Sequence, residues 1–145
     1  MNTVDQVLEQ KGHAIWSIAR DAPVLEALQL MAEKNCGALL VVEDERLVGL
    51  FSERDYARKI ALKGKSSRHT RIDEIMSRRV VYVQPSQTVE ECMALMTEKR
   101  VRHLPVVDSD EKLLGMISIG DLVKAVISEQ EFIIHQLENY ITGSL

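Results

Sequence analysis

The sequence predicts a mixed α/β (α+β) fold: two similar β-α-β-β-α units, with additional helices before the first unit and after the second. Three observations predict it: an internal repeat, strand-like and helix-like segments in the same order in both copies, and a pattern Gly-x-x-Ser-x-x-Asp that occurs once in each copy. The chain has 145 residues, the usual size of one compact domain. Either unit alone would have a small core, so we expect the two to pack together.

The repeat appears when the sequence is compared with itself at an offset of 65 residues. VLEALQLMAEKNCGALLVVE from Val24 then lies over VEECMALMTEKRVRHLPVVD from Val89, with nine identities in twenty positions. One extra residue in the second copy changes the offset to 66, and GLFSERD from Gly49 lies over GMISIGD from Gly115. Self-similarity of this extent indicates a tandem repeat.

Each unit begins with a short β-rich run, at residues 15–18 in the first unit and 80–83 in the second. A helix is expected next, because apolar residues recur at i, i+3, i+4 and i+7 from Val24 and again from Val89. Two strands joined by an acidic turn follow, and a second helix begins at the Ser of each Gly-x-x-Ser-x-x-Asp pattern. The paired strands are expected at residues 39–42 and 47–51, and at residues 104–107 and 113–117.

Helical apolar spacing also occurs outside the two units. Short stripes precede each unit, and they consist of Val4, Val7 and Leu8, and of Ile72, Ile75 and Met76. The pattern of the last helix continues past Ile127. We therefore divide the chain into a first repeat at 4–63, a basic linker at 64–71, a second repeat at 72–127 and a C-terminal helical extension at 128–145.

Charge is distributed unevenly along the chain. The net charge is −4, but the stretch from Arg58 to Arg79 has eight basic and two acidic residues, or +6, which leaves −10 for the rest. An acidic protein of this kind is not expected to bind nucleic acid. The basic stretch could attract a small polyanion, or it could be a solvated linker.

Several protein classes are not expected from this sequence. It has no apolar run of the ~20 residues that a membrane helix needs and no signal-peptide pattern at its start, so we expect a cytoplasmic protein without a membrane partner. Its two cysteines form no CxxC and its histidines are scattered, so no metal is expected. Because it has no P-loop, GxGxxG or nucleophile–base pattern, we do not expect an enzyme.

The repeated Gly-x-x-Ser-x-x-Asp has two interpretations. Ser at a helix N-cap with an acid three residues later is close to a capping box, so Ser52/Asp55 and Ser118/Asp121 could serve only to begin two helices. The same geometry suits a nucleotide, because a helix N-terminus favours phosphate and a carboxylate can accept hydrogen bonds from the two hydroxyls of a ribose.

The chain resembles a pair of cystathionine-β-synthase (CBS) domains, also called a Bateman module, from about Val4 to Ile127. The resemblance is carried by the repeat and by the segments GALLVVE, GLFSERDYARK, RHLPVV and MISIGDLVKAVI. The chain closely resembles the small stand-alone bacterial proteins that consist of this pair and little else. The resemblance implies two repeats packed about a pseudo-twofold axis and adenine nucleotides bound in clefts between them.

The resemblance also implies which residues bind the nucleotide. Asp55 and Asp121 would hold ribose hydroxyls, and Ser52 and Ser118 would contact ribose or phosphate. The adenine would be lined by Cys36, Gly37, Ala38 and Leu39 in one cleft, by Arg102, His103, Leu104 and Pro105 in the other, and by the first strands around Ile15 and Val80. Arg54, Lys65 and Arg79 are candidates for phosphate.

The two clefts differ in sequence, so equal affinity is not expected. Leu40 stands where the second repeat has Pro105, and Gly120 replaces Arg54 at the start of the last helix. We expect a non-catalytic sensor with AMP as the first candidate ligand and ADP, ATP or NAD(H) as alternatives. It would act on a regulated protein that the sequence does not name. The remaining hypothesis is an adaptor in which the Ser/Asp pairs are only caps.

The segment after Ile127 predicts an assembly. It has three glutamates and no lysine or arginine, yet it keeps many large apolar residues that the repeats do not need, namely Phe132, Ile133, Ile134, Leu137, Tyr140 and Ile141. Apolar patches of this extent usually mark contacts. We expect a homodimer with twofold symmetry in which these tails add to the interface. The competing expectation is that the tail folds back over the N-terminal apolar stripe.

Overall fold

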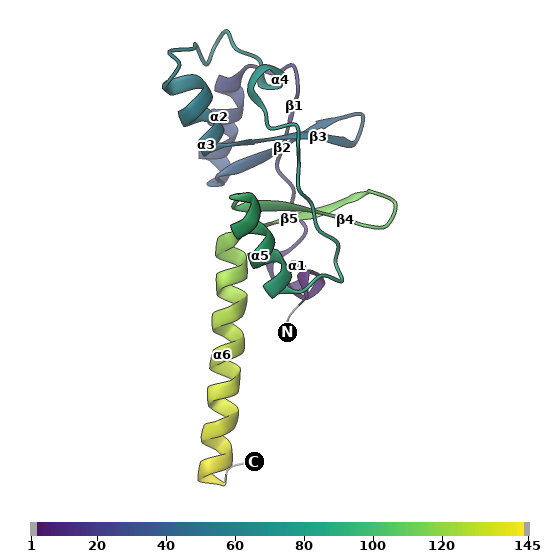
Figure 1. The fold of residues 1–145 in the computed structure, drawn as a ribbon, viewed down its shortest axis with the longest axis vertical. Helices are drawn as coiled ribbons and strands as arrows, with labels where there is room; N and C mark the ends of the chain where they lie inside the picture. Colours follow the sequence, from purple (N-terminus) through teal and green to yellow (C-terminus); the bar gives the residue numbers. More distant parts are fainter. Residues whose placement is uncertain (1–2, 144–145) are drawn as a thin grey trace. The chain divides into compact units, whose positions relative to one another are not determined.

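The computed structural model describes residues 3–143, which form two compact units (Figure 1). One unit comprises Ala14–Tyr82 and is called here the first-repeat unit. The other, the second-repeat unit, joins the N-terminal residues through His13 to the residues from Val83 onward. Residues 144–145 of the predicted C-terminal extension lie outside the described residues.

The first-repeat unit contains a three-stranded sheet and the helices that pack with it. Its strand order is β1-β2-β3, with β1 parallel to β2 and β2 antiparallel to β3. The elements are β1 (Ser17–Ala19), α2 (Val24–Lys34), β2 (Ala38–Glu43), β3 (Arg46–Ser52), α3 (Glu53–Asp55), the π-helix η1 (Tyr56–Ala61) and α4 (Ile72–Ile75). The predicted order β-α-β-β-α is confirmed in this unit.

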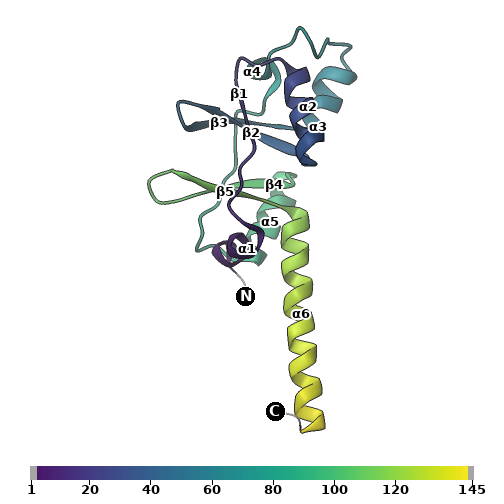
Figure 2. The ribbon, with the colours of Figure 1, turned by 180° about the vertical axis from the view of Figure 1, so that it is seen from behind.

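The second-repeat unit contains a β4–β5 hairpin and three helices. Its elements are α1 (Val4–Lys11), α5 (Val89–Lys99), β4 (His103–Val107), β5 (Leu113–Ser118) and α6 (Ile119–Thr142). Helix α6 contacts α5, α1 and β5, and α1 lies beside the hairpin, as the views from both sides show (Figures 1 and 2). The buried residues of α6, Leu122 and Ala125, lie in its first two turns.

The predicted first strand of the second repeat, residues 80–83, is reduced to a single bridge between Val83 and Val106. Proline explains the difference. In the first repeat the Leu40 N–H donates to the Trp16 carbonyl at 3.1 Å. The matching residue in the second repeat is Pro105, which has no N–H to donate, so the ladder is shortened at that point.

The two short apolar stripes exchange places in the fold. The stripe that precedes the first repeat packs in the second-repeat unit, and the stripe that precedes the second repeat packs in the first-repeat unit. Ile72, Ile75 and Met76 belong to the buried core of the first-repeat unit, together with Phe51 of β3. Val4, Val7 and Leu8 are buried on α1, which contacts β5 and α6 of the second-repeat unit. The compact units thus cross the expected boundaries at 4–63 and 72–127, which themselves stay a prediction.

The first glycine of each Gly-x-x-Ser-x-x-Asp pattern allows this packing. A Cβ at Gly49 would lie 2.6 Å from the Met76 sulfur and 3.1 Å from the Ser77 carbonyl oxygen. A Cβ at Gly115 would lie 2.9 Å from a Leu8 methyl group. The missing side chain therefore lets a segment from outside the repeat approach the strand in both units.

Helix α6 continues for 24 residues and extends away from the hairpin of its own unit (Figure 1). Its last apolar side chains are exposed: Leu137 by 57%, Tyr140 by 75% and Ile141 by 81%. The tail therefore does not fold back over the stripe on α1, and the competing expectation is wrong. No helix in the described part of the chain is both long and apolar enough to cross a membrane.

Candidate functional site

Both Ser/Asp pairs form complete capping boxes. Ser52 Oγ accepts the Asp55 N–H at 3.2 Å, and Asp55 Oδ2 accepts the Ser52 N–H at 3.0 Å. The same exchange joins Ser118 and Asp121, at 3.2 and 2.8 Å. The capping interpretation is therefore confirmed as a structural role, and the remaining question is what else each carboxylate can do.

Asp55 is almost fully enclosed by its partners. Its Oδ2 also accepts the Ser52 hydroxyl at 3.1 Å, while Oδ1 lies 3.1 Å from both the Ser77 hydroxyl and the Lys59 ammonium. The Lys59 Nζ donates in addition to the Ile75 carbonyl at 2.9 Å. Because the side chain is only 9% exposed and both oxygens have protein partners, a ribose would have to replace existing contacts of Asp55.

Asp121 is more accessible and less fully paired. Its Oδ2 accepts the Ser118 N–H and lies 2.6 Å from the Lys11 Nζ, and the side chain is 24% exposed. None of the described residues forms a hydrogen bond or ion pair with its Oδ1. Burial acts to raise the pKa of Asp121, but the hydrogen bonds from Lys11 and Ser118 outweigh it and hold the pKa below its ordinary value.

The predicted adenine-lining residues of the first repeat lie next to its Ser/Asp pair. Ala38 is paired with Ser52 across β2 and β3, and the Gly37 carbonyl accepts the Glu53 N–H at 3.1 Å. Cys36 and Gly37 are half-buried, whereas Ala38 and Leu39 are fully buried. The backbone at residues 36–38 can thus border a ligand at Ser52, but the Leu39 side chain belongs to the core.

The second repeat brings its predicted residues together in the same way. His103 is paired with Ser118, and the Arg102 carbonyl accepts the Ile119 N–H at 2.9 Å. Arg102 is exposed, His103 is half-buried, and Leu104 and Pro105 are buried. The exposed Arg102 and the half-buried His103 therefore lie beside the start of α6. The matching residues of the first repeat are Gly37 and Ala38.

Four of the other predicted residues, namely Lys65, Arg79, Ile15 and Val80, form no hydrogen bond or ion pair with the Ser/Asp pairs within the part of the chain that the structure describes. Lys65 and Arg79 are exposed and form no hydrogen bond or ion pair with Asp55 among the described residues. Ile15 and Val80 are half-buried and belong, with Arg54, to the first-repeat unit. The nucleotide-binding roles of these five residues stay predictions.

Sequence reasoning missed Lys11, Lys59 and Ser77 as partners of the two aspartates. Lys59 could have been found, because it lies four residues after Asp55 on a helix, which is the spacing of an ion pair. A signal for Lys11 also exists. VDQVLEQK, ending at Lys11, lies over IDEIMSRR, ending at Arg79, so the N-terminal stripe repeats together with its terminal cation.

The thiol of Cys36 does not have the features of a reactive cysteine. Burial and the nearby Glu53 raise the pKa of Cys36, although a backbone hydrogen bond involving Ala38 acts in the opposite direction. Reactive thiols instead have a lowered pKa. Burial raises the pKa of Cys92 on α5 to about 11. No cluster of His, Cys, Asp and Glu within residues 3–143 could hold a metal ion.

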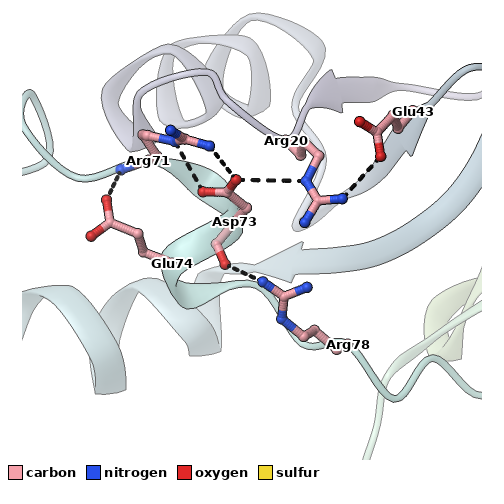
Figure 3. A network of polar contacts seen from close by, with 6 residues as sticks. All are labelled: Arg20, Glu43, Arg71, Asp73, Glu74 and Arg78. Atoms are coloured by element: carbon pink, nitrogen blue, oxygen red, sulfur yellow. Dashed lines mark hydrogen bonds and ion pairs between the residues drawn. The ribbon is translucent and has the colours of Figure 1, made fainter.

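A pocket of about 570 Å³ lies at the far end of β2 from Ala38, around Val42, Glu43 and Asp44. Arg20 and Asp73 form its central ion pairs. Arg20 lies between Glu43 and Asp73, and Arg71 also binds Asp73 (Figure 3). The Arg20 guanidinium is 2.9 Å from the Glu43 carboxylate and 3.6 Å from that of Asp73. These opposite charges pair with one another and connect the segment containing α4 to β1 and β2, so we interpret the cluster as structural.

Two repeats of the order β-α-β-β-α, the second with its first strand reduced to a bridge, each have a capped Ser/Asp pair where a strand meets a helix, and together they define a tandem α/β module. The family model of the CBS domain matches residues 13–62 and 72–128. The chain therefore belongs to the CBS-domain family and carries two CBS domains in tandem, which confirms the resemblance seen in the sequence. CBS domains are in general regulatory or signal-transduction modules.

Similar proteins share this architecture. The mitochondrial CBS domain-containing protein CBSX3 of Arabidopsis thaliana is 38% identical over 151 residues, which cover 97% of this chain and 72% of that protein. A CBS-domain protein of Burkholderia ambifaria has a solved structure with a TM-score of 0.84 and 53% identity, covering 88% of this chain and 96% of that one. A hexameric CBS-CP12 protein from bloom-forming cyanobacteria has a TM-score of 0.74 and 29% identity, covering 83% and 66%.

Proposed function

We propose that the protein is a non-catalytic regulatory module that binds an adenine nucleotide, with AMP as the first candidate, and acts as an energy or metabolite sensor. The observation that carries this proposal is the carboxylate of Asp121. It stands at the start of α6, it is partly exposed, and none of the described residues forms a hydrogen bond or ion pair with its Oδ1. A carboxylate in this position can accept hydrogen bonds from a ribose, while Arg102 and Lys11 supply positive charge for a phosphate.

The structure favours the second repeat as the tighter site. Asp121 has one carboxylate oxygen available to a ligand, whereas both oxygens of Asp55 have protein partners. The sequence predicted unequal affinity in the two clefts, and we propose that the cleft containing Asp121 is the one that binds more tightly. ADP, ATP and NAD(H) share the adenosine group and are the alternatives to AMP.

Ligand-dependent thermal stability tests the proposal. A ligand at one hundred times its dissociation constant adds about 2.7 kcal/mol to the free energy of unfolding. For a chain of this size each kcal/mol raises the melting temperature by roughly 2–4 °C. We expect AMP to raise it by several degrees, Asp121→Asn to remove most of that rise, and the matched Asp55→Asn variant to remove less. A wild-type protein that responds to none of AMP, ADP, ATP and NADH contradicts the proposal.

The second candidate function is an adaptor whose Ser/Asp pairs only cap helices. The completeness of both capping boxes favours it, because no ligand is needed to explain why Ser and Asp occur at this spacing. The same experiment decides between the two. If Asp121→Asn lowers the stability but no nucleotide stabilises the wild type, the adaptor is the better account. Product analysis after incubation with ATP or NADH tests the non-catalytic assignment, and turnover would overturn it.

The proposal includes a homodimer that uses α6. Apolar residues of α6 recur in adjacent pairs every seven residues, at 126 and 127, 133 and 134, and 140 and 141, and all of them except the half-buried Val126 are exposed. A repeat of seven suits a helix packed lengthwise against another helix. Truncation after Ile127, followed by light scattering, is expected to convert a dimer into a monomer. A dimer that survives truncation would show that the tail has no role, and a monomeric wild type would contradict the proposed homodimer.

A further inference from the structure

The side chain of Lys11 reaches the proposed nucleotide site from an element outside the CBS repeats. Its Nζ lies 2.6 Å from Asp121 Oδ2 and donates to the Met116 carbonyl at 2.5 Å. Helix α1 can deliver it there because Gly115 leaves room for Leu8 against β5. Lys11 lies outside residues 13–62 and 72–128, so the family pattern assigns it no role.

The Lys11–Asp121 ion pair is suited to exchange rather than to permanent stability. The two side chains are 32% and 24% exposed, and ion pairs with access to solvent contribute little to stability. A ribose hydroxyl could therefore replace the ammonium on Asp121 at small cost. The Met116 carbonyl would still hold Nζ beside the site, and a flexible lysine ammonium is a suitable partner for phosphate.

We propose that Lys11 is the phosphate-binding residue of the Asp121 site and that ligand binding exchanges its ion pair. The carboxylate of Asp121 passes from the Lys11 ammonium to the ribose hydroxyls, and the ammonium passes to the phosphate of the same ligand. This inference rests on the proposed function. The exchange would make the site selective for nucleoside phosphates. An uncharged nucleoside would break the Lys11–Asp121 ion pair without giving the ammonium a new anionic partner.

Lys59 in the first-repeat unit provides the matched contrast. It also bridges an aspartate and a backbone carbonyl, those of Asp55 and Ile75. Its aspartate, however, is buried and additionally bound by the Ser77 hydroxyl. The exchange therefore belongs to Lys11, and Lys59 retains its contacts.

The test compares AMP with adenosine by isothermal titration calorimetry on the full chain. We expect Lys11→Met to weaken AMP binding about tenfold, the loss of one charge-assisted contact. Adenosine binding should stay the same or tighten, because no cation competes for Asp121. The matched variant Lys59→Met should leave the ratio of the two affinities unchanged, and Lys11→Arg should retain most of the preference for AMP.

Each outcome bears on one of the two claims. Equal weakening of AMP and adenosine by Lys11→Met, or no change in either, would overturn the role of Lys11. A wild type that binds neither ligand would contradict the proposed function instead. If Lys11→Met does not fold, Lys11→Gln is measured in its place. If neither variant folds, Lys11 is required for folding and its role as an exchangeable ligand contact is rejected.

Discussion

The two Gly-x-x-Ser-x-x-Asp segments have the same pattern and the same capping geometry, yet their aspartates have different surroundings. Asp55 has Ser52, Ser77 and Lys59 on its two oxygens, whereas Asp121 uses one oxygen for Ser118 and Lys11. The comparison teaches that a repeated motif specifies the local turn but not the partners of its acid. Lys59 lies within the repeat of Asp55, whereas Ser77 and Lys11 come from segments outside the repeat whose aspartate they contact.

The source of the cation shows how this difference arises. Lys59 lies on the same helical segment as Asp55, four residues later, and the matching position in the second repeat is the buried Ala125. The second unit receives its cation from α1 instead, 110 residues earlier in the chain. One site therefore carries its lysine within the repeat, and the other depends on the packing of a separate helix.

The largest expected difference is in stability. Asp55→Ala should lower the free energy of unfolding by about 2–3 kcal/mol, because it leaves Ser77 and Lys59 without their buried acceptor. Asp121→Ala should cost about 1 kcal/mol, the usual loss of an N-cap interaction. Urea denaturation of both variants measures the difference. Equal losses would show that the two aspartates are equivalent in the folded protein.

A smaller difference is expected at the two glycines. Gly49→Ala should cost about 1–2 kcal/mol, since its Cβ would approach both the Met76 sulfur and the Ser77 backbone. Gly115→Ala should cost less than about 1 kcal/mol, because the Leu8 methyl group can move aside. Thermal denaturation compares the two. A greater loss at Gly115 would contradict the packing of α1 described here.

The smallest effect concerns the pH dependence of the Lys11 contact. The pKa of Asp121 is lowered in the folded protein, so the contact stabilises the fold above the ordinary carboxyl pKa of about 3.9 and is lost as the pH falls through the lowered value. Lys11→Met should therefore raise the pKa of Asp121, as measured by NMR titration of its carboxyl carbon. It should cost at most about 1 kcal/mol at neutral pH and less at strongly acid pH, where only the hydrogen bond to the Met116 carbonyl is lost. An unchanged pKa would show that Lys11 does not contact Asp121 in solution.

Much of the fold could be predicted because its signals are local. Apolar spacing identified α2 and α5, and the Ser-x-x-Asp pattern placed the N-caps at Ser52 and Ser118. The first strand of the second repeat was expected in full but is a single bridge, because the effect of Pro105 falls on a neighbouring strand. The effect of Pro105 depends on which strands are paired with each other. The spacing of apolar residues at 80–83 does not indicate that pairing.

The candidate site could be predicted only in part. The positions of Ser118, Asp121, Arg102 and His103 beside one another follow from a hairpin that leads into a helix, which the sequence indicates. Lys65 and Arg79 were expected as phosphate ligands through the family resemblance and their positive charge, and these two roles stay predictions. Lys11 was not expected, although it is the cation that contacts Asp121.

By itself, the sequence determined the tandem repeat, which a comparison of the sequence with itself reveals without any knowledge of contacts. It also determined the helices with one buried face and the two capped helix starts, because these depend on residues a few positions apart. The tertiary structure decided which apolar stripe packs in which unit, and with it the pairing of Lys11 with Asp121. Both stripes have the same apolar spacing, so their hydrophobic free energy does not distinguish one repeat from the other. The choice depends on the close fit of Leu8 at Gly115 and of Met76 at Gly49, which exists only in the folded protein.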